Sequence, residues 1–444
     1  SATGSLARPL DARELAVTLV LRAESLHEFG ALADASLPAV GPVEIRGQLT
    51  GSQDSYRVSG MHATVEDSDL SGDVVVSFGG ARPKVTAHLT SKLINEAVFL
   101  PAEEEEGAKI EKKPDRLFPS EPLTFTVLHT LDAALDMDAT VLRLPDMELQ
   151  QVQLSLNLTG GILRVKRATA LLNGGNVSVD LRLDTSQNVA DVSLQLDARK
   201  VEMGRVLKYF GKRDLIGGGL TNVKMFLSGR GNSIAALMAS LNGRVLVDMG
   251  EAEMQNRTLE VIGADLLSQS VRILNPFSKE EKTTRLLCSV VFLSIKNGIV
   301  TSDNGIAAET DKIYVIGSGI INLETEEVDI GIHPVARKGI GIGAGSLTEM
   351  MRVRGSLAKP SLAPDVMGIG KEGLRIGAAI STGGISLLAE GLYGRTVADT
   401  HPCAAVLGRA SAAEKEESRS EAKEGKKDKE PKESGGLLRN IFGK

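Results

Sequence analysis

The amino-acid sequence predicts a mostly β protein, in which many strands and a few short helices follow one another as a long antiparallel meander. Apolar and polar residues alternate with period 2 in many windows, and turn signals separate these windows at intervals of roughly 10 to 13 residues. Apolar residues make up 42% of the 444 residues, yet only 3% are aromatic and there is no Trp. Packed sandwich cores usually use aromatic as well as aliphatic side chains, so this balance is unusual.

The alternation is clearest in residues 152–158, 177–183 and 189–197. Successive side chains of a strand point to opposite faces, so alternation gives one apolar face and one wet face. The pattern recurs in six shorter windows: 74–78, 85–89, 223–227, 245–249, 313–316 and 328–332. Each window is therefore expected to be a half-buried strand.

Turn signals lie between these windows. Asn-Gly and similar pairs supply the positive φ angles of tight hairpins, which join neighbouring strands in antiparallel order. Such signals occur at residues 78–83, 173–176, 185–188, 296–298 and 303–305. Apolar stripes at helical spacing are fewer, and we expect short capping or linking helices there: at 24–34 and 201–210, and more weakly at 258–274 and 345–352.

Composition and motifs exclude several classes of function. The net charge of −6 excludes a strongly basic nucleic-acid binder, and the aliphatic content excludes a wholly disordered chain. No window of 18 uncharged apolar residues predicts an ordinary transmembrane helix. The Gly-rich residues 339–345 lack the pattern of a phosphate loop, the six His residues form no i, i+4 pair, and no G-x-S-x-G motif occurs. We therefore expect no enzyme, no metal and no cofactor.

The two cysteines exclude a disulfide-rich scaffold. Cys288 lies in an apolar strand window, and Cys403 follows a proline. In an oxidising compartment the two residues could form a disulfide. The alternative is two separate buried thiols.

Several motifs resemble those of one family. Residues 37–47 and 68–91 resemble the conserved region of AsmA-like proteins. Residues 355–365 resemble a late strand motif of that family, G-x-L-x-x-P-x-x-x-P-D, and residues 401–407 resemble its terminal N-P-C-A-A-x-L motif, with His401 where Asn is common. The resemblance covers about residues 5–408. Members usually begin with a membrane-spanning helix, so we expect this chain to be a C-terminal portion of a longer protein or a processed form.

The resemblance implies a fold and a function. The fold is an elongated, strongly bent antiparallel β-sheet forming a taco-shaped hydrophobic groove. The function is to carry phospholipid along that groove between the inner and outer membranes of a bacterial envelope, in support of outer-membrane biogenesis. The location implied is periplasmic, with an inner-membrane anchor preceding this chain. About 22 to 26 strands at ~4.8 Å would give a groove of roughly 105–125 Å.

On this basis the chain divides into six segments. They are a first β-groove unit with a short capping helix (1–101), a charged, Pro-containing linker (102–122), further β-groove units (123–365), an apolar, Gly-rich helical end segment (366–408), a disordered charged tail (409–436) and a short amphipathic tip (437–444). The end segment is expected either to plug the sheet or to contact a membrane.

The alternating aliphatic residues are the predicted lining of the groove, where they would meet acyl chains. They are Val74, Val76, Phe78, Val85, Leu89, Leu154, Leu156, Val177, Val179, Leu181, Val192, Leu194, Leu196, Val245, Val247, Ile330 and Ile332. The expected partners are phospholipid, the two membranes and envelope proteins. The main alternative is a structural or regulatory scaffold for outer-membrane protein assembly, with its apolar face closed by packing. A surface-exposed β-solenoid adhesin is a third, less favoured hypothesis.

Overall fold

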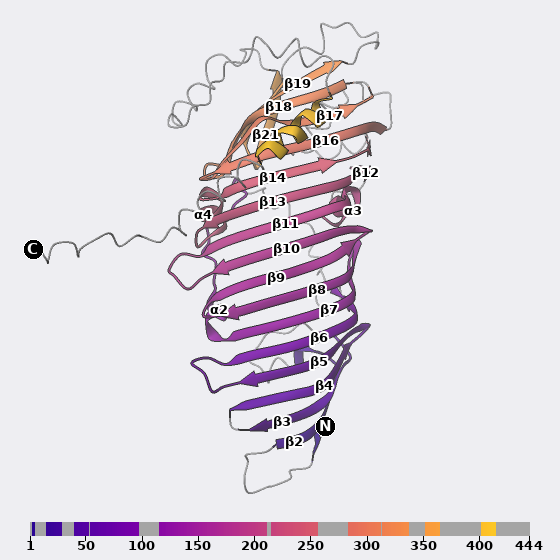
Figure 1. The fold of residues 1–444 in the computed structure, drawn as a ribbon, viewed down its shortest axis with the longest axis vertical. Helices are drawn as coiled ribbons and strands as arrows, with labels where there is room; N and C mark the ends of the chain where they lie inside the picture. Colours follow the sequence, from indigo (N-terminus) through magenta and orange to yellow (C-terminus); the bar gives the residue numbers. More distant parts are fainter. Residues whose placement is uncertain are drawn as a thin grey trace, which may run out of the picture.

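A computed structural model describes residues 2–4, 15–28, 40–52, 54–96, 115–210, 215–255, 283–311, 313–336, 351–364 and 401–413. Within these residues, 21 strands form a single sheet (Figure 1). The strands are β1 (Ala2–Gly4), β2 (Leu15–Ala23), β3 (Val43–Ser52), β4 (Ser55–Val65), β5 (Ser68–Ser77), β6 (Lys84–Asn95), β7 (Asp132–Leu144), β8 (Met147–Thr159), β9 (Ile162–Leu172), β10 (Gly175–Asp184), β11 (Asp191–Glu202), β12 (Ile216–Gly218), β13 (Leu220–Arg230), β14 (Asn242–Met249), β15 (Ala252–Gln255), β16 (Thr283–Lys296), β17 (Ile299–Thr310), β18 (Ile313–Asn322), β19 (Glu327–Ala336), β20 (Met351–Ser356) and β21 (Lys359–Pro364).

The strands follow one another almost in sequence order, so the predicted elongated β fold is confirmed. The short strands β12 and β15 pair with each other, beside the ends of β13 and β14. Among the described strands, β1 pairs only with β2 and β21 only with β20, so the sheet is open. Apart from β12 and β15, the other 19 described strands lie side by side in succession. Their 18 spacings of ~4.8 Å give a length of about 85 Å along the sheet.

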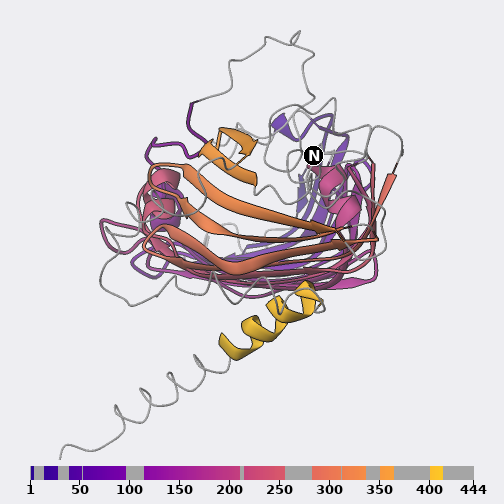
Figure 2. The same cartoon turned by 90° about the horizontal axis from the view of Figure 1, so that it is seen from above.

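The sheet is bent into a trough (Figure 2). Its strands carry β-bulges, where an extra residue bends a strand locally. Gly60 (φ 56°) lies in the bulge between Val58 and Met61, and Lys200 (φ 57°) lies in the bulge between Ala198 and Val201. Such bulges recur in several strand pairs along the sheet and add to its curvature.

One pairing departs from the predicted antiparallel meander. Strands β6 and β7 are parallel, in register from Lys84 and Asp132 to Asn95 and Arg143. Parallel neighbours cannot be joined by a hairpin and need a long crossover. The crossover contains the charged segment predicted as a linker between two β units. The strands on both sides of it belong to one continuous sheet.

The described end of this crossover, residues 115–125, runs past distant strands before it reaches β7. Glu326, in the turn between β18 and β19, is 1% exposed. Its carboxylate accepts hydrogen bonds from the backbone N–H groups of Leu117 (2.6 Å) and Phe118 (3.1 Å) and from Nε of Arg116 (3.1 Å). The crossover is thus attached to a turn more than 200 residues further along the chain.

Burial disfavours the charged form of Glu326, but the hydrogen bonds from Leu117, Phe118 and Arg116 outweigh it and hold its pKa below the ordinary value of 4.5. A carboxylate with a lowered folded pKa contributes stability that is complete well above pH 4.5 and is lost as the pH falls through the folded pKa. The attachment of the crossover is therefore acid-sensitive.

Within the part of the chain that the structure describes, three short helices and one longer helical stretch accompany the sheet, besides the helical residues His27 and Glu28. They are α2 (Thr126–Thr130), α3 (Met203–Tyr209), α4 (Ile234–Ala239) and the C-terminal helix, residues 402–413. Figure 2 shows α3 and α4 at opposite rims of the trough and the C-terminal helix beneath its convex face. Among these described residues, no helix combines the length and apolar character needed to cross a bilayer.

The helix predictions are partly correct. Helix α3 lies within the predicted segment 201–210. Of segment 24–34 only residues up to 28 are described, with His27 and Glu28 helical, and segment 258–274 lies outside the described residues. In segment 345–352 the described residues Met351 and Arg352 begin a strand, because they pair with β19. Helices α2 and α4 were not predicted, since five or six residues are too few for an apolar stripe.

The C-terminal helix continues to residue 413, beyond the predicted start of the charged tail at 409. Its apolar residues Val406, Leu407 and Ala410 lie at helical spacing. This apolar stripe extends past residue 409, and the charged run begins only at Glu414. Residues 366–400 of the predicted end segment and residues 414–444 of the predicted tail and tip lie outside the described residues.

We predict that Glu326→Gln lowers the free energy of unfolding by about 1–3 kcal/mol at pH 7, because the amide cannot accept all three hydrogen bonds. The loss should shrink as the pH falls below 4.5 and through the lowered pKa of folded Glu326, because the wild-type carboxyl then becomes protonated too. Urea unfolding at several pH values measures this, with Glu327→Gln as an exposed control. An equal effect of both substitutions would contradict the buried-carboxylate interpretation.

Gly243 provides a test of the local backbone. Its φ is 139°, and an added Cβ would lie 1.9 Å from the Phe226 carbonyl oxygen. Gly243→Ala should therefore lower the free energy of unfolding by about 1–3 kcal/mol. Gly331→Ala, whose Cβ would meet its nearest neighbour at 3.7 Å, is the control and should change stability much less in thermal unfolding.

Candidate functional site

The concave face of the trough is the candidate site. The C-terminal helix packs on the opposite, convex face and so shows which strand residues point to each side. Cys403 and Val406 of this helix pack in a cluster with Leu246, Val290 and Phe292, which point to the convex face. Their strand neighbours point the other way, because side chains alternate. Val245 and Val247 therefore face the concave side.

One cross-strand ladder runs along the concave face from β2 to β21 without a break in register. We call it the long ladder. Each of its positions is paired with the next, and each is aliphatic, Gly or Pro: Val17, Leu49, Val58, Val74, Ala87, Leu135, Leu156, Val165, Leu181, Leu194, Leu227, Gly243, Ile295, Val300, Ile321, Val328, Gly355 and Pro360.

Three shorter ladders lie beside it on the same face. The second contains Met61, Gly72, Leu89, Met137, Leu154, Ala168, Val179, Leu196, Met225, Val245 and Leu293. The third contains Gly51, Tyr56, Val76, Val85, Ala133, Leu158, Leu163, Leu183, Val192 and Gly229. The fourth contains Ala170, Val177, Ala198, Val223, Val247, Val291, Ile306, Gly317, Ile332 and Met351. None of these positions carries a charged side chain.

The structure brings the predicted lining residues together on this face. All except Phe78 and Ile330 are positions of the four ladders. Ile330 lies two residues before Ile332 in β19 and packs in the same cluster. Phe78 lies just beyond β5, is 51% exposed and packs edge-on against Tyr56 at the rim. It was included because the alternation continues through it, while the strand itself ends at Ser77. Contact of this face with lipid stays a prediction.

Burial changes along the concave face. In β5 to β14 most ladder side chains, such as Val74, Leu156 and Leu194, are half-buried. From β16 onward the same face forms closed clusters, in which Ile313 is 0% and Val353 1% exposed. The concave face therefore has a packed end and a longer stretch where apolar side chains keep accessible surface.

The convex face is polar over most of the sheet. One of its ladders contains Asp73, His88, Asp136, Ser155 and Arg167, and the imidazole Nδ1 of His88 lies 3.5 Å from Asp136. Such side chains remain hydrated on an exposed sheet face. The contrast between the two faces is what the period-2 alternation predicted.

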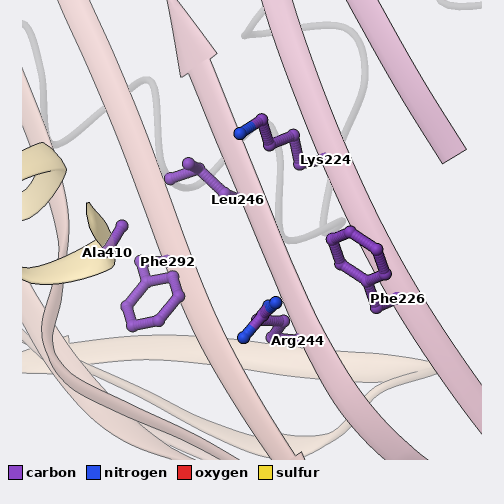
Figure 3. Close-up of a pocket in the computed structure, with 6 residues that line it drawn as sticks. All are labelled: Lys224, Phe226, Arg244, Leu246, Phe292 and Ala410. Carbon is purple, nitrogen blue, oxygen red and sulfur yellow. The ribbon is translucent and has the colours of Figure 1, made fainter. Parts of the chain in front are cut away.

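The convex face is apolar under the C-terminal helix. Val290 and Ala307 are both 0% exposed there and pack against Cys403 and Val406. A shallow pocket adjoins this contact, and Figure 3 shows its lining residues Lys224, Phe226, Arg244, Leu246, Phe292 and Ala410. The guanidinium of Arg244 lies 4.9 Å from the centre of the Phe226 ring, a cation–π distance.

A disulfide joins Cys288 of β16 to Cys403. The two cysteines are therefore bonded, and the alternative of two separate buried thiols is wrong. The docking of the helix was not predicted. Leu246, Val290 and Phe292 occupy the polar phase of their strands, and this reversal is the sequence signal that indicates a covered patch.

Comparison with known proteins places the chain in a family. The family model described as AsmA family matches residues 44–304, more than half of the chain. The chain belongs to the AsmA family. Membership supports an envelope-associated role.

Two curated relatives from Escherichia coli (strain K12) are similar to this AsmA-family chain. AsmA family protein YhjG is 21% identical over 76% of the chain and 51% of its own length. Protein AsmA is 22% identical over 67% of the chain and 50% of its own length. The chain spans about half the length of these relatives. No solved structure matches it.

The burial gradient leads to a prediction about stability. Val353→Asp should lower the free energy of unfolding by about 3–5 kcal/mol, because the new carboxylate is buried without a partner. Leu194→Asp should cost about 1–2 kcal/mol, since the side chain there keeps contact with solvent. Urea unfolding of both variants measures the difference. Equal losses would mean that the concave face is a dry core at β11 as well as at β20.

Proposed function

We propose that this AsmA-family chain carries phospholipid along its concave face, in the periplasm between the inner and outer membranes, and so supports outer-membrane biogenesis. The observation that carries the proposal is the long ladder, which is apolar at each of the 18 strands that it crosses between β2 and β21. A lipid sliding along the half-buried part of this ladder, from β2 to β14, would meet no charged ladder side chain and no strand at which its acyl chains must return to water.

The energetics favour movement along such a face. Each buried CH₂ group of an acyl chain costs about 0.8 kcal/mol to expose to water. A continuous aliphatic wall removes most of that cost at every step. Val, Leu and Ile provide such a wall without polar groups that would hold a headgroup in one place. Transfer would then be passive, and no catalytic residue or cofactor is needed for it.

The burial gradient limits where lipid would lie. The half-buried stretch from β2 to β14 contains 12 successive strands, or about 50 Å at ~4.8 Å per spacing. In β18 to β20 the apolar side chains of this face pack against one another in a closed cluster. We therefore propose that acyl chains bind between β2 and β14.

A scaffold role in outer-membrane protein assembly is the second candidate. The closed cluster at β18 to β20 favours it, since packing rather than a ligand covers the apolar face there. The two candidates differ in whether lipid contacts the half-buried part of the ladders.

Photo-crosslinking tests the proposal directly. A photo-reactive residue in place of Leu194 should crosslink to phospholipid in detergent-free protein, and native mass spectrometry should show co-purified lipid. The control position is Gln195, the next residue of β11, which is exposed on the convex face. Absence of both lipid and crosslink at Leu194, or equal crosslinking at Gln195, would overturn the proposal.

A transfer assay tests the role of the wall. Leu194→Asp should slow the transfer of fluorescent phospholipid between vesicles about tenfold or more, which corresponds to 1.4 kcal/mol. Gln195→Asp places the same charge on the convex face and should leave transfer unchanged. Circular dichroism of both variants checks that the sheet is retained. Equal transfer by the two variants would contradict passage along the ladder.

A further inference from the structure

Four side chains that bear metal-ligand atoms meet where the C-terminal helix docks on the convex face. Cys288 of β16 and Glu309 of β17 are cross-strand partners. His401 immediately precedes the helix, and Cys403 lies in its first turn. The four residues come from three separate parts of the chain. A search for His residues at helical spacing therefore predicts no metal site here.

The ligand atoms are close together. Both Sγ atoms and a carboxylate oxygen of Glu309 all lie within 4.8 Å of one another. Nδ1 of His401 lies 3.4 Å from Oε2 of Glu309. Ligand atoms of a tetrahedral ion lie about 2.0–2.3 Å from the metal and therefore about 3.3–3.8 Å from one another. The His401–Glu309 distance is in this range, whereas the two Sγ atoms are bonded in the disulfide and must move apart on reduction.

In the oxidised chain these groups already have roles. The two sulfur atoms form the disulfide, and Glu309 accepts a hydrogen bond from the Cys403 backbone N–H at 3.4 Å. A carboxylate at the beginning of a helix is also favoured by the helix dipole. The oxidised arrangement is therefore complete without a metal.

We propose that the reduced chain binds one Zn²⁺ at this cluster, through Cys288, Cys403, Glu309 and His401. Two equivalents of a thiol reductant convert the disulfide to two cysteine thiols and are themselves oxidised to a disulfide. Binding of Zn²⁺ then releases the two thiol protons and leaves both cysteines as thiolate ligands.

The chemistry of the donor set and its surroundings favour zinc. Thiolate, imidazole and carboxylate are the ligands of tetrahedral zinc sites. Glu309 is 4% and Cys403 6% exposed, within the apolar cluster of Val290, Ala307 and Val406. A low dielectric strengthens the attraction between the ion and its anionic ligands. The His401 side chain is 79% exposed and leaves a path for the ion to enter.

The consequence is that the helix stays docked in either redox state. The disulfide holds it to β16 when oxidised, and the metal holds it to β16 and β17 when reduced. The site is on the face opposite the four ladders, so it does not depend on lipid binding.

Cobalt titration of the whole chain tests the site. The reduced protein should bind one Co²⁺ per chain, with a thiolate-to-cobalt charge-transfer band and the visible bands of a tetrahedral ion. The oxidised protein, which has the same sequence and fold, should give neither band. Excess Zn²⁺ should abolish both bands by displacement. No thiolate–cobalt band in the reduced protein at stoichiometric Co²⁺ would overturn the proposal.

Variants test the ligand set. Cys288→Ser should abolish the charge-transfer band, and Glu309→Gln and His401→Ala should each weaken Co²⁺ binding at least about tenfold. His333→Ala replaces an exposed histidine elsewhere in the sheet and should leave binding unchanged. Wild-type affinity in either the Glu309 or the His401 variant would refute the four-residue site.

Hydrogen exchange gives a readout of docking that needs no variant. Amides of residues 402–413 should be protected in the oxidised chain, lose protection on reduction in the presence of a chelator, and regain it when Zn²⁺ is added. Failure of Zn²⁺ to restore protection to the reduced chain would contradict the proposed role of the metal.

Discussion

The alternation of side chains has to keep one register through the whole sheet, and most of the structure depends on this constraint. A one-residue slip in any strand would move its aliphatic residues to the polar face and its charged residues into the trough. The long ladder shows that no such slip survives from Val17 to Pro360. Where a bulge inserts a residue, as between Ala198 and Val201, the pairing resumes with apolar residues on the concave face. The bulges thus bend the sheet without mixing its faces.

The trough is also held by contacts between parts of the chain that are far apart in sequence. The crossover between β6 and β7 attaches to the β18–β19 turn through buried Glu326. The C-terminal helix attaches to β16 through the disulfide and covers the apolar patch on the convex face. In a long sheet each strand contacts mainly its two neighbours, so rigidity over distance has to come from such attachments.

Most of the concave face could be predicted because its signal is local. Residues 177–183 and 189–197 each alternate with period 2, and a hairpin turn lies between them. Their aliphatic residues pair in the structure, Val179 with Leu196 and Leu181 with Leu194. Phe78 was assigned to the same face because the period-2 alternation does not show where a strand ends, and β5 ends at Ser77. Helix α4 was missed because its six residues depend on Ser233 as a cap and on packing against Leu227 and Ile295, rather than on a stripe of its own.

The sequence by itself determined the β class, the short hairpins, the family and which side chains share a face, since alternation and turn residues act within a few positions. Only the tertiary structure decided that β6 and β7 run parallel, that Glu326 receives the crossover, and that Cys288, Glu309, His401 and Cys403 meet beneath the trough. The parallel pair β6–β7 joins residues 48 positions apart. The contacts of Glu326 with the crossover and of the C-terminal helix with the sheet join residues about 90 to 210 positions apart. Their formation depends on the bend and the accumulated register of the whole sheet, which no local pattern encodes. The shortage of aromatic residues fits this arrangement, because the wide apolar wall of the trough is built mainly from small aliphatic side chains.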